Sequence, residues 1–311
     1  MMNLRALSGC FILAALGMGA MGARAPQNPP PPQAPEAEIK LTPAELELYK
    51  NAQTLIDWIP SQIHQSPYLH NLRAAQGQDR LPLVLERVGQ TCTHLFDDFL
   101  NVTCDEEVVS KGAMSYSRVA RDFHYVVVRG PGGDLPAFAE YRTDLKGKPL
   151  NAASFWDFSM ITSGFAGSWA FFRSEEQQDS HFRYFGTQTI RNRECQVVGF
   201  AQNPERATDL GVFHMQGTSV NVVVQGLAWI DAQTFQVLRI RTWLLAPRKD
   251  IGLSSQISTV DFYPIRPAGT KRVMWLPRDV QVDAVFRGRK VRNTHQYSNY
   301  KLFRVESTIK P

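Results

Sequence analysis

The densest group of titratable side chains lies between positions 94 and 107 of this 311-residue sequence. Carboxylates held together could bind a divalent cation or act as acid–base groups. The simpler interpretation is the solvated end of a helix and the loop after it, so we predict no metal site and no cofactor. The group contains His94, Asp97, Asp98, Asp105, Glu106 and Glu107.

A second set that could move protons is His295 with Tyr297 and Tyr300. On a terminal strand such residues more often pack and form hydrogen bonds, and their spacing indicates a β-bulge. The chain contains none of the common sequence motifs for nucleophile elbows, zinc hydrolases, phosphate loops or dinucleotide binding. We therefore expect no catalytic residues, and an enzyme is the third of three functional hypotheses.

Apolar and aromatic residues recur at spacings of three and four between positions 157 and 173, which predicts a helix there. If a sheet curls around this helix, the stripe either plugs the concave side or lines a cavity for an apolar ligand. Two tryptophans on predicted strands would complete that lining. The candidate ligand-binding residues are Phe158, Ile161, Phe165, Trp169, Phe172, Trp229 and Trp275. A dry core with no ligand is the alternative.

Charge is distributed unevenly along the chain, whose net charge is +5. Residues 186–311 contain 18 Lys and Arg against 9 Asp and Glu, a local net charge of +9. Four basic residues, Arg287, Arg289, Lys290 and Arg292, crowd one predicted hairpin. They could dock on an anionic membrane surface or another envelope component, whereas a solvated basic face is the alternative.

The first 25 residues are typical of a secretory signal peptide: a short basic start, an apolar run and then small residues. Cleavage could follow Ala25 or Gly22, and we expect no lipid on Cys10, since the apolar run follows this cysteine. Residues 26–40 are a proline-rich linker. We therefore predict a periplasmic or secreted protein, which argues against nucleic acid as a partner.

Three cysteines remain after the predicted signal peptide. An oxidising compartment favours a disulfide between the two that are close in sequence, Cys92 and Cys104. Cys195 stands among apolar neighbours and is expected to be a buried, inert thiol.

Helices are predicted in an N-terminal segment, residues 41–107. Thr42, Pro43 and Glu45 form a capping box with proline at the first position, which predicts a helix from Pro43 to about Trp58. A second apolar stripe predicts a helix over 81–99.

The remaining chain, 108–308, is predicted to be an antiparallel β domain, interrupted by the aromatic helix. Period-two patterns and turn residues delimit the strands, and Gly288-Arg289 is predicted as a type II′ hairpin loop. The predicted C-terminal strands are 193–202, 220–231, 235–246, 256–265, 274–287 and 290–307. The fold class is α+β, with N-terminal helices followed by a curved sheet.

Over roughly residues 41–308 the chain resembles a family of uncharacterised exported bacterial proteins with no assigned activity. The segments that carry the likeness are 98–104 (DFLNVTC), 140–144 (EYRTD), 225–231 (QGLAWID), 244–248 (LLAPR), 275–278 (WLPR) and 292–300 (RNTHQYSNY). The strand succession is also similar to the lipoprotein-carrier (LolA-like) half-barrels. That likeness implies a curved antiparallel sheet around an apolar cavity.

Together these patterns favour an exported noncatalytic protein that holds a lipid or other apolar ligand in a half-barrel. The second hypothesis is a structural or interaction protein of the cell envelope without a small ligand. A cavity of several hundred Å³ beside the aromatic residues would favour the first hypothesis. A solid core would favour the second.

Overall fold

The structure is a computed structural model that describes most of the chain between residues 41 and 303. Its described residues are 14–16, 41–98, 101–112, 118–129, 138–155, 157–162, 164–165, 168–207, 211–215 and 218–303. Apart from Ala14–Leu16, the predicted signal peptide and the proline-rich linker lie outside them. No helix among the described residues is long and apolar enough to cross a membrane.

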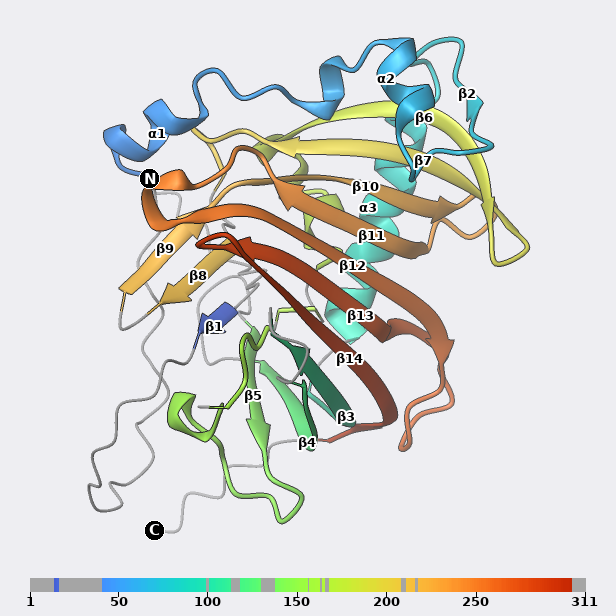
Figure 1. Cartoon of the computed structure of the whole chain (residues 1–311). Coiled ribbons are helices and arrows are strands. Elements are labelled where there is room, and N and C mark those ends of the chain that lie inside the picture. Colours follow the sequence, from blue (N-terminus) through green and yellow to red (C-terminus); the bar gives the residue numbers. More distant parts are fainter. Residues whose placement is uncertain are drawn as a thin grey trace, which may run out of the picture.

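An open sheet of 11 strands dominates the molecule, and Figure 1 shows it bending around the long helix α3. Every neighbouring pair in it is antiparallel. In spatial order the strands are β2 (Arg73–Ala74), β6 (Ser180–Ile190), β7 (Arg193–Gln202), β10 (Val224–Asp231), β11 (Val237–Leu244), β12 (Leu253–Ile265), β13 (Met274–Phe286), β14 (Arg289–Leu302), β3 (Val102–Lys111), β4 (Arg118–Arg129) and β5 (Phe138–Thr143).

A second sheet has three short strands. Strand β8 (Gly211–Met215) lies between β1 (Ala14–Leu16) and β9 (Thr218–Val222). β1 pairs parallel with β8, and β8 pairs antiparallel with β9. The predicted strand 220–231 is therefore two strands, β9 and β10, in different sheets.

Within the described ranges the α-helices are α1 (Pro43–Tyr49), α2 (Pro60–Gln65) and α3 (Leu81–Asp98). Helix α3 confirms the prediction for 81–99. The capping box of α1 is also confirmed, since the Glu45 amide donates to Thr42 Oγ1 at 3.3 Å. Short 3₁₀ turns occupy η1 (Leu55–Asp57), η2 (Ala152–Phe155), η3 (Ala170–Phe172), η4 (Gln177–Asp179) and η5 (Lys249–Ile251).

Helix α1 ends at Tyr49 rather than near Trp58 because the chain after it is fixed to the sheet. The Tyr49 hydroxyl accepts from the Val223 amide at 3.2 Å, and the Leu55 amide donates to Gln225 Oε1 at 2.7 Å. These bonds commit backbone and side-chain groups to strands instead of to a continuing helix. The predicted length was wrong because periodicity does not report such contacts.

The sheet has two covered faces around its centre, which we call inner, facing α3, and outer. Strand β10 is buried along its whole length, as expected for a central strand. Its Ala228 and Ile230 join the core under α3, while Leu227 and Trp229 join a separate core under the N-terminal segment. Leu55 and Leu69 belong to that outer core.

The predicted aromatic helix over about 157–173 is wrong for the residues described there, which form turns and extended chain with one 3₁₀ turn at η3. Gly164 has φ of +88°, a value that an α-helix does not use. The Thr162 amide donates to Asn293 and its carbonyl accepts from Arg142, so both groups are bonded to the sheet. Among the residues described between 157 and 173 there is therefore no aromatic helix for the sheet to wrap, and α3 takes that place.

The tip of the β13–β14 hairpin also differs from its prediction. Phe286 pairs with Arg289, so the two loop residues are Arg287 and Gly288. Their φ angles are +47° and +73°, which fits a type I′ turn instead of the predicted type II′. The predicted boundary between the helical N-terminal segment and the β domain, at residues 107 and 108, falls inside β3.

Candidate functional site

Helix α3 closes the inner side of the sheet through one apolar stripe. Val84, Val88, Cys92 and Phe96 recur every four residues and are at most 2% exposed. Side chains spaced by four lie on one face of a helix. The other face is polar and exposed, as Glu86, Arg87, Gln90 and His94 show.

The helix lies close against the chain that precedes β6. A Cβ placed on Gly89 would stand 2.7 Å from Ser174 Oγ and 3.3 Å from the Phe172 carbonyl oxygen. The Phe96 ring meets Trp169 edge to face at 6.1 Å between centroids, and Arg173 lies 3.9 Å from the Phe96 centroid. Glycine at position 89 thus allows the approach.

The seven predicted ligand-binding residues do not line one space. Phe165, Trp169 and Phe172 share the core under α3, whereas Phe158 and Ile161 form a small cluster with Val108 and Phe123. The other two lie on β10 and β13. Trp229 is in the outer core, with Nε1 donating to Gln188 Oε1 at 2.7 Å, and the half-buried Trp275 packs against both cores.

The space between α3 and the sheet is almost filled. A cavity of about 10 Å³ lies among Cys92, Leu95, Trp169 and Trp275, a volume near the minimum for one water molecule. Trp169 Nε1 is buried and has no hydrogen-bond partner in the described part of the protein. A ligand of acyl-chain size would need α3 to move.

The predicted disulfide is wrong in the structure, where Cys92 and Cys104 are separate buried thiols. Six residues of α3 follow Cys92 and carry the chain about 9 Å along the helix axis before β3 begins. Cys92 is left beside Arg173, and Cys104 beside Tyr300 and Glu106. Cys195 is a buried thiol, as predicted, and burial raises its pKa to about 12.

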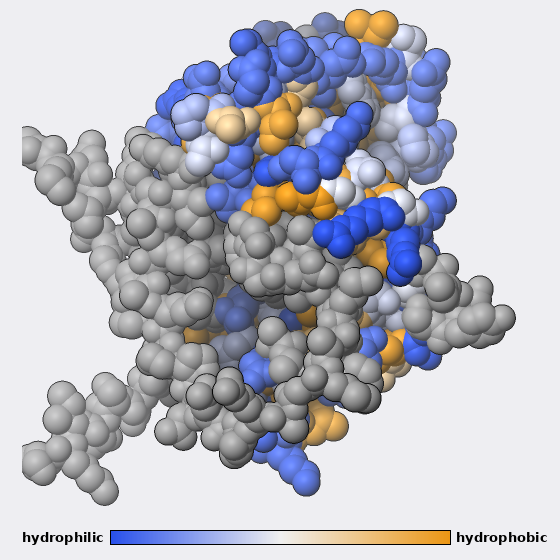
Figure 2. Space-filling model, turned by 60° about the vertical axis from the view of Figure 1, so that its left-hand side comes forward, coloured by the Kyte–Doolittle hydropathy of each residue, from blue (hydrophilic) through white to orange (hydrophobic). Residues whose placement is uncertain are grey.

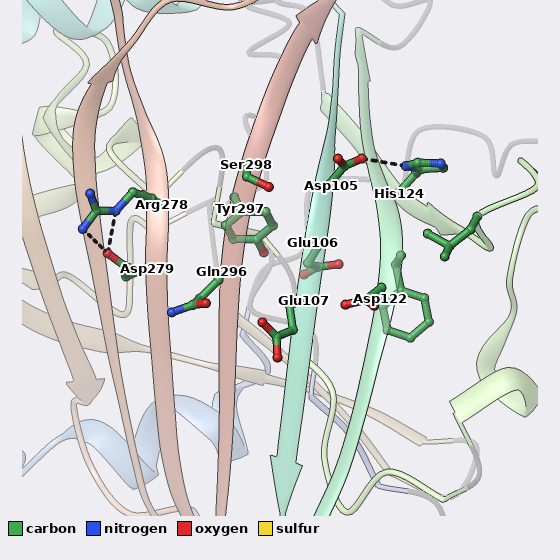
Figure 3. A pocket seen from close by; sticks show the side chains of 12 residues that line it. Asp105, Glu106, Glu107, Asp122, His124, Arg278, Asp279, Gln296, Tyr297 and Ser298 are labelled. Atoms are coloured by element: carbon green, nitrogen blue, oxygen red, sulfur yellow. Dashed lines mark hydrogen bonds and ion pairs between the residues drawn. The ribbon is translucent and has the colours of Figure 1, made fainter.

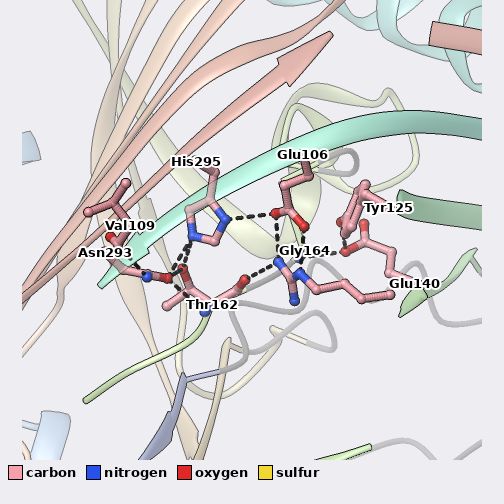
Figure 4. Close-up of polar contacts among 9 residues, drawn as sticks. Glu106, Val109, Tyr125, Glu140, Thr162, Gly164, Asn293 and His295 are labelled. Carbon is pink, nitrogen blue, oxygen red and sulfur yellow. Dashed lines mark hydrogen bonds and ion pairs between the residues drawn. The ribbon is translucent and has the colours of Figure 1, made fainter. Parts of the chain in front are cut away.

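A buried polar network joins β3, β5 and β14 on the inner face (Figure 4). Glu106 accepts from Arg142 Nε at 2.6 Å and Nη2 at 2.8 Å, and its Oε1 lies 2.7 Å from His295 Nδ1. His295 Nε2 lies 2.9 Å from Thr162 Oγ1 and 2.7 Å from Asn293 Oδ1. All five residues are at most 8% exposed.

The charges of this network are coupled. Burial alone would raise the pKa of Glu106, but Arg142 and His295 outweigh it and lower the pKa to about 2. Burial raises the pKa of Glu140 to about 7, although Tyr125 and the Gly164 amide donate to its carboxyl group. Burial also lowers the pKa of His295, against the attraction of Glu106.

Hydroxyl, imidazole and carboxylate in this order also occur in acyl-transfer enzymes. Here Thr162 is 0% exposed, His295 1% and Glu106 1%, and neither described pocket is lined by Thr162 or His295. The network instead ties the segment around Thr162 to the sheet. Of the predicted proton-transfer set only His295 joins it: Tyr300 donates to the Pro277 carbonyl, and the predicted bulge lies between Ser298 and Lys301.

A polar groove of about 820 Å³ lies on the outer face over β13, β14, β3 and β4 (Figure 3). Strand alternation sends Asp105 and Glu107 into it, while Glu106 points to the interior, so the predicted titratable group is divided. Asp105 is 3.0 Å from His124 Nδ1. Within the described residues no group of three His, Cys, Asp or Glu side chains could hold a metal ion.

The Glu106–Arg142 pair is not among the predicted site residues, although the sequence carries a signal for one of its members. Val102, Cys104, Val108 and Ser110 alternate with exposed or half-buried residues along β3. Glu106 falls in the buried half of that alternation, and a carboxylate there requires a partner. The identity of the partner could not be inferred, because Arg142 is 36 residues away.

These observations define an open, curved antiparallel sheet with an amphipathic helix across its inner face. No protein-family model matches the chain, and no curated protein matches it. Solved structures do resemble it. One is a putative outer membrane lipoprotein-sorting protein domain from Vibrio parahaemolyticus, with 10% identity over 70% of this chain and 91% of that one at a TM-score of 0.41.

Two further structures have similar coverage. A DUF1329 family protein from Desulfovibrio piger shares 13% identity over 72% of this chain and 93% of its own, at a TM-score of 0.38. A LolA superfamily protein from Nitrosomonas europaea shares 11% identity over 70% and 94%, at a TM-score of 0.34.

Proposed function

We propose that this protein is an exported, noncatalytic carrier that holds a lipid acyl chain or a similar apolar ligand between α3 and the inner face of the sheet. The observation that carries the proposal is the nature of the contact made by α3. An amphipathic helix covers an open sheet face with an apolar stripe, and its outward face is polar and exposed.

Ligand binding would replace contacts that α3 now makes. The stripe buries aliphatic and aromatic groups, each of which contributes about 1.5–3 kcal/mol when fully buried. An acyl chain offers the same apolar surface, so it can substitute for the helix at little net cost. One polar bond that this movement would break is the one from Gln177 Nε2 to the Leu85 carbonyl, at 2.9 Å.

Native mass spectrometry of protein purified from its own cell envelope tests this function. We expect a co-purifying lipid or apolar molecule, and a bare mass of the mature chain would contradict the proposal. Titration with a fluorescent fatty acid should then locate the site. Leu95→Gln, which alters the cavity lining, should weaken binding, whereas Leu83→Gln on the exposed side of α3 should leave it unchanged.

A second candidate is a structural or interaction protein of the envelope without a small ligand. The filled core under α3 favours it, because the one cavity described there has about 10 Å³. Under this alternative both leucine variants would behave alike, and neither purified nor reconstituted protein would take up the fatty acid.

A further inference from the structure

One end of the large sheet carries basic side chains that have no acidic partner among the described residues. The β13–β14 hairpin, the turn at η5 and the ends of β3 and β4 meet there. The Arg287 amide donates to the Gly252 carbonyl at 2.7 Å, and Arg292 pairs in register with Lys111, which pairs with Arg118. We call the exposed residues of this end the basic rim: Lys111, Arg118, Lys249, Arg287, Arg289 and Lys290.

The local acidic residues are already occupied. Asp283 binds Arg292 Nε at 2.5 Å, and Asp250 binds Arg248 at 2.8 Å. Four basic residues were predicted to contact an anionic surface. Of these, Arg292 is paired with Asp283, whereas Arg287, Arg289 and Lys290 have no ion-pair partner among the described residues. Across the described residues no ion pair reaches the basic rim.

The arrangement of charge is unfavourable for the isolated sheet. Lys111 and Arg118, which have no ion-pair partner among the described residues, stand directly opposite each other on β3 and β4, where like charges destabilise pairing. An anionic partner would remove that repulsion. Figure 2 brings the left-hand side of Figure 1 forward, and the described surface there carries hydrophilic residues with hydrophobic ones between them.

Apolar groups accompany the charges. Phe286 and Ile251 are half-buried next to the rim, and the Arg287 guanidinium lies 5.1 Å from the Phe286 ring centroid. Basic side chains beside partly exposed apolar ones are the combination that binds the interface of an anionic bilayer.

We propose that the basic rim docks this protein on the surface of an anionic lipid membrane. The proposal stands apart from the carrier function, because it requires no ligand under α3. Phosphate head groups would neutralise the six charges of the basic rim. The apolar side chains Phe286 and Ile251 would contact the boundary between head groups and acyl chains.

Cosedimentation of the mature chain with vesicles tests this docking. We expect binding to phosphatidylcholine vesicles that contain phosphatidylglycerol, little binding to pure phosphatidylcholine, and loss of binding at raised salt. Each basic residue near such a surface is worth about fivefold in partitioning. The triple variant Arg287→Gln, Arg289→Gln, Lys290→Gln should therefore lower the partition coefficient about 100-fold.

Two controls separate a specific rim from general charge. Lys146→Gln with Lys148→Gln removes two exposed charges from another turn and should leave vesicle binding within about twofold. The conservative variant Arg287→Lys, Arg289→Lys should retain most of the binding. Equal losses in the rim and control variants, salt-insensitive binding, or tighter binding to duplex DNA than to anionic vesicles would overturn the proposal. Fatty-acid uptake by the triple variant reports separately on the carrier function.

Discussion

At the scale of single residues, the Glu106–Arg142 pair is the contact on which the inner face near β3 most depends. Both side chains are buried, and Arg142 also donates to the Thr162 carbonyl at 2.7 Å. Removing one partner of a buried pair leaves an uncompensated charge and costs about 3–5 kcal/mol. We expect Glu106→Gln to lower the free energy of unfolding by that amount in urea titrations.

The double variant Glu106→Gln, Arg142→Met provides the control for this prediction. With both charges gone, no buried ion is left unpaired, so stability should recover in part. A loss below about 1 kcal/mol in the single variant would show that Glu106 is not the counterion that Arg142 needs.

Glu140 should make stability depend on pH. Its folded pKa of about 7 lies above its ordinary 4.5, so the folded state binds its proton more tightly than the unfolded state. Its contribution is fully present below pH 4.5 and is lost as pH rises through about 7. Unfolding midpoints should show a decline over this window that is absent in Glu140→Gln.

Other groups titrate nearby, so the difference between the two proteins is the informative quantity. The lowered pKa of His295 acts in the opposite direction, with stability lost as pH falls below about 6.5. Parallel pH profiles for wild type and Glu140→Gln would contradict a raised pKa at Glu140.

At the scale of elements, hydrophobic periodicity predicts the helices and strands whose conformation depends on local sequence. The strand 193–202 and the helix 81–99 lie nearly where they are predicted, because the helix has a clear apolar face and the strand is buried from Cys195 to Gln202. The aromatic segment 157–173 is not a helix where it is described, although its apolar residues have helical spacing. There Gly164 and the bonds from Thr162 to Asn293 and Arg142 impose an irregular path, and such contacts are invisible before the fold is known.

The candidate site was predicted less completely than the fold. Trp169 and Phe172 do lie under a helix, but the helix is α3 and not their own segment. Trp229 was assigned to the same cavity, yet it faces the opposite side of β10, because successive strand residues alternate between faces. Strand β10 is apolar on both faces. Its sequence therefore does not indicate which face lies toward α3.

The turn at the hairpin tip gives a test of element geometry. Gly288 has φ of +73°, and a Cβ added there would meet no atom within 4 Å. Gly288→Ala should therefore meet no neighbouring atom and lower the unfolding free energy only by the strain of a Cβ in the left-handed conformation, about 1–2 kcal/mol. An unchanged urea midpoint would show that the residue does not hold a left-handed conformation.

At the scale of the whole molecule, the account requires export. The signal peptide predicted in residues 1–25 should be absent from protein isolated from the envelope or the medium. Intact mass measurement is expected to show a chain that begins after Gly22 or Ala25, with three reduced cysteines and no lipid. A full-length mass in the cytoplasmic fraction alone would contradict it.

The central claim is that an apolar ligand binds only when α3 separates from the sheet. Cysteines at positions 89 and 174 should form a disulfide that locks α3, because a Cβ at position 89 lies 2.7 Å from Ser174 Oγ. The native thiols are buried and have raised pKa values, so they should not compete.

The most direct measurement is fatty-acid binding by the Gly89→Cys, Ser174→Cys variant, oxidised and then reduced in the same sample. The account predicts at least tenfold weaker binding in the oxidised form and recovery after reduction. Equal affinity in the two forms would contradict a site beneath α3.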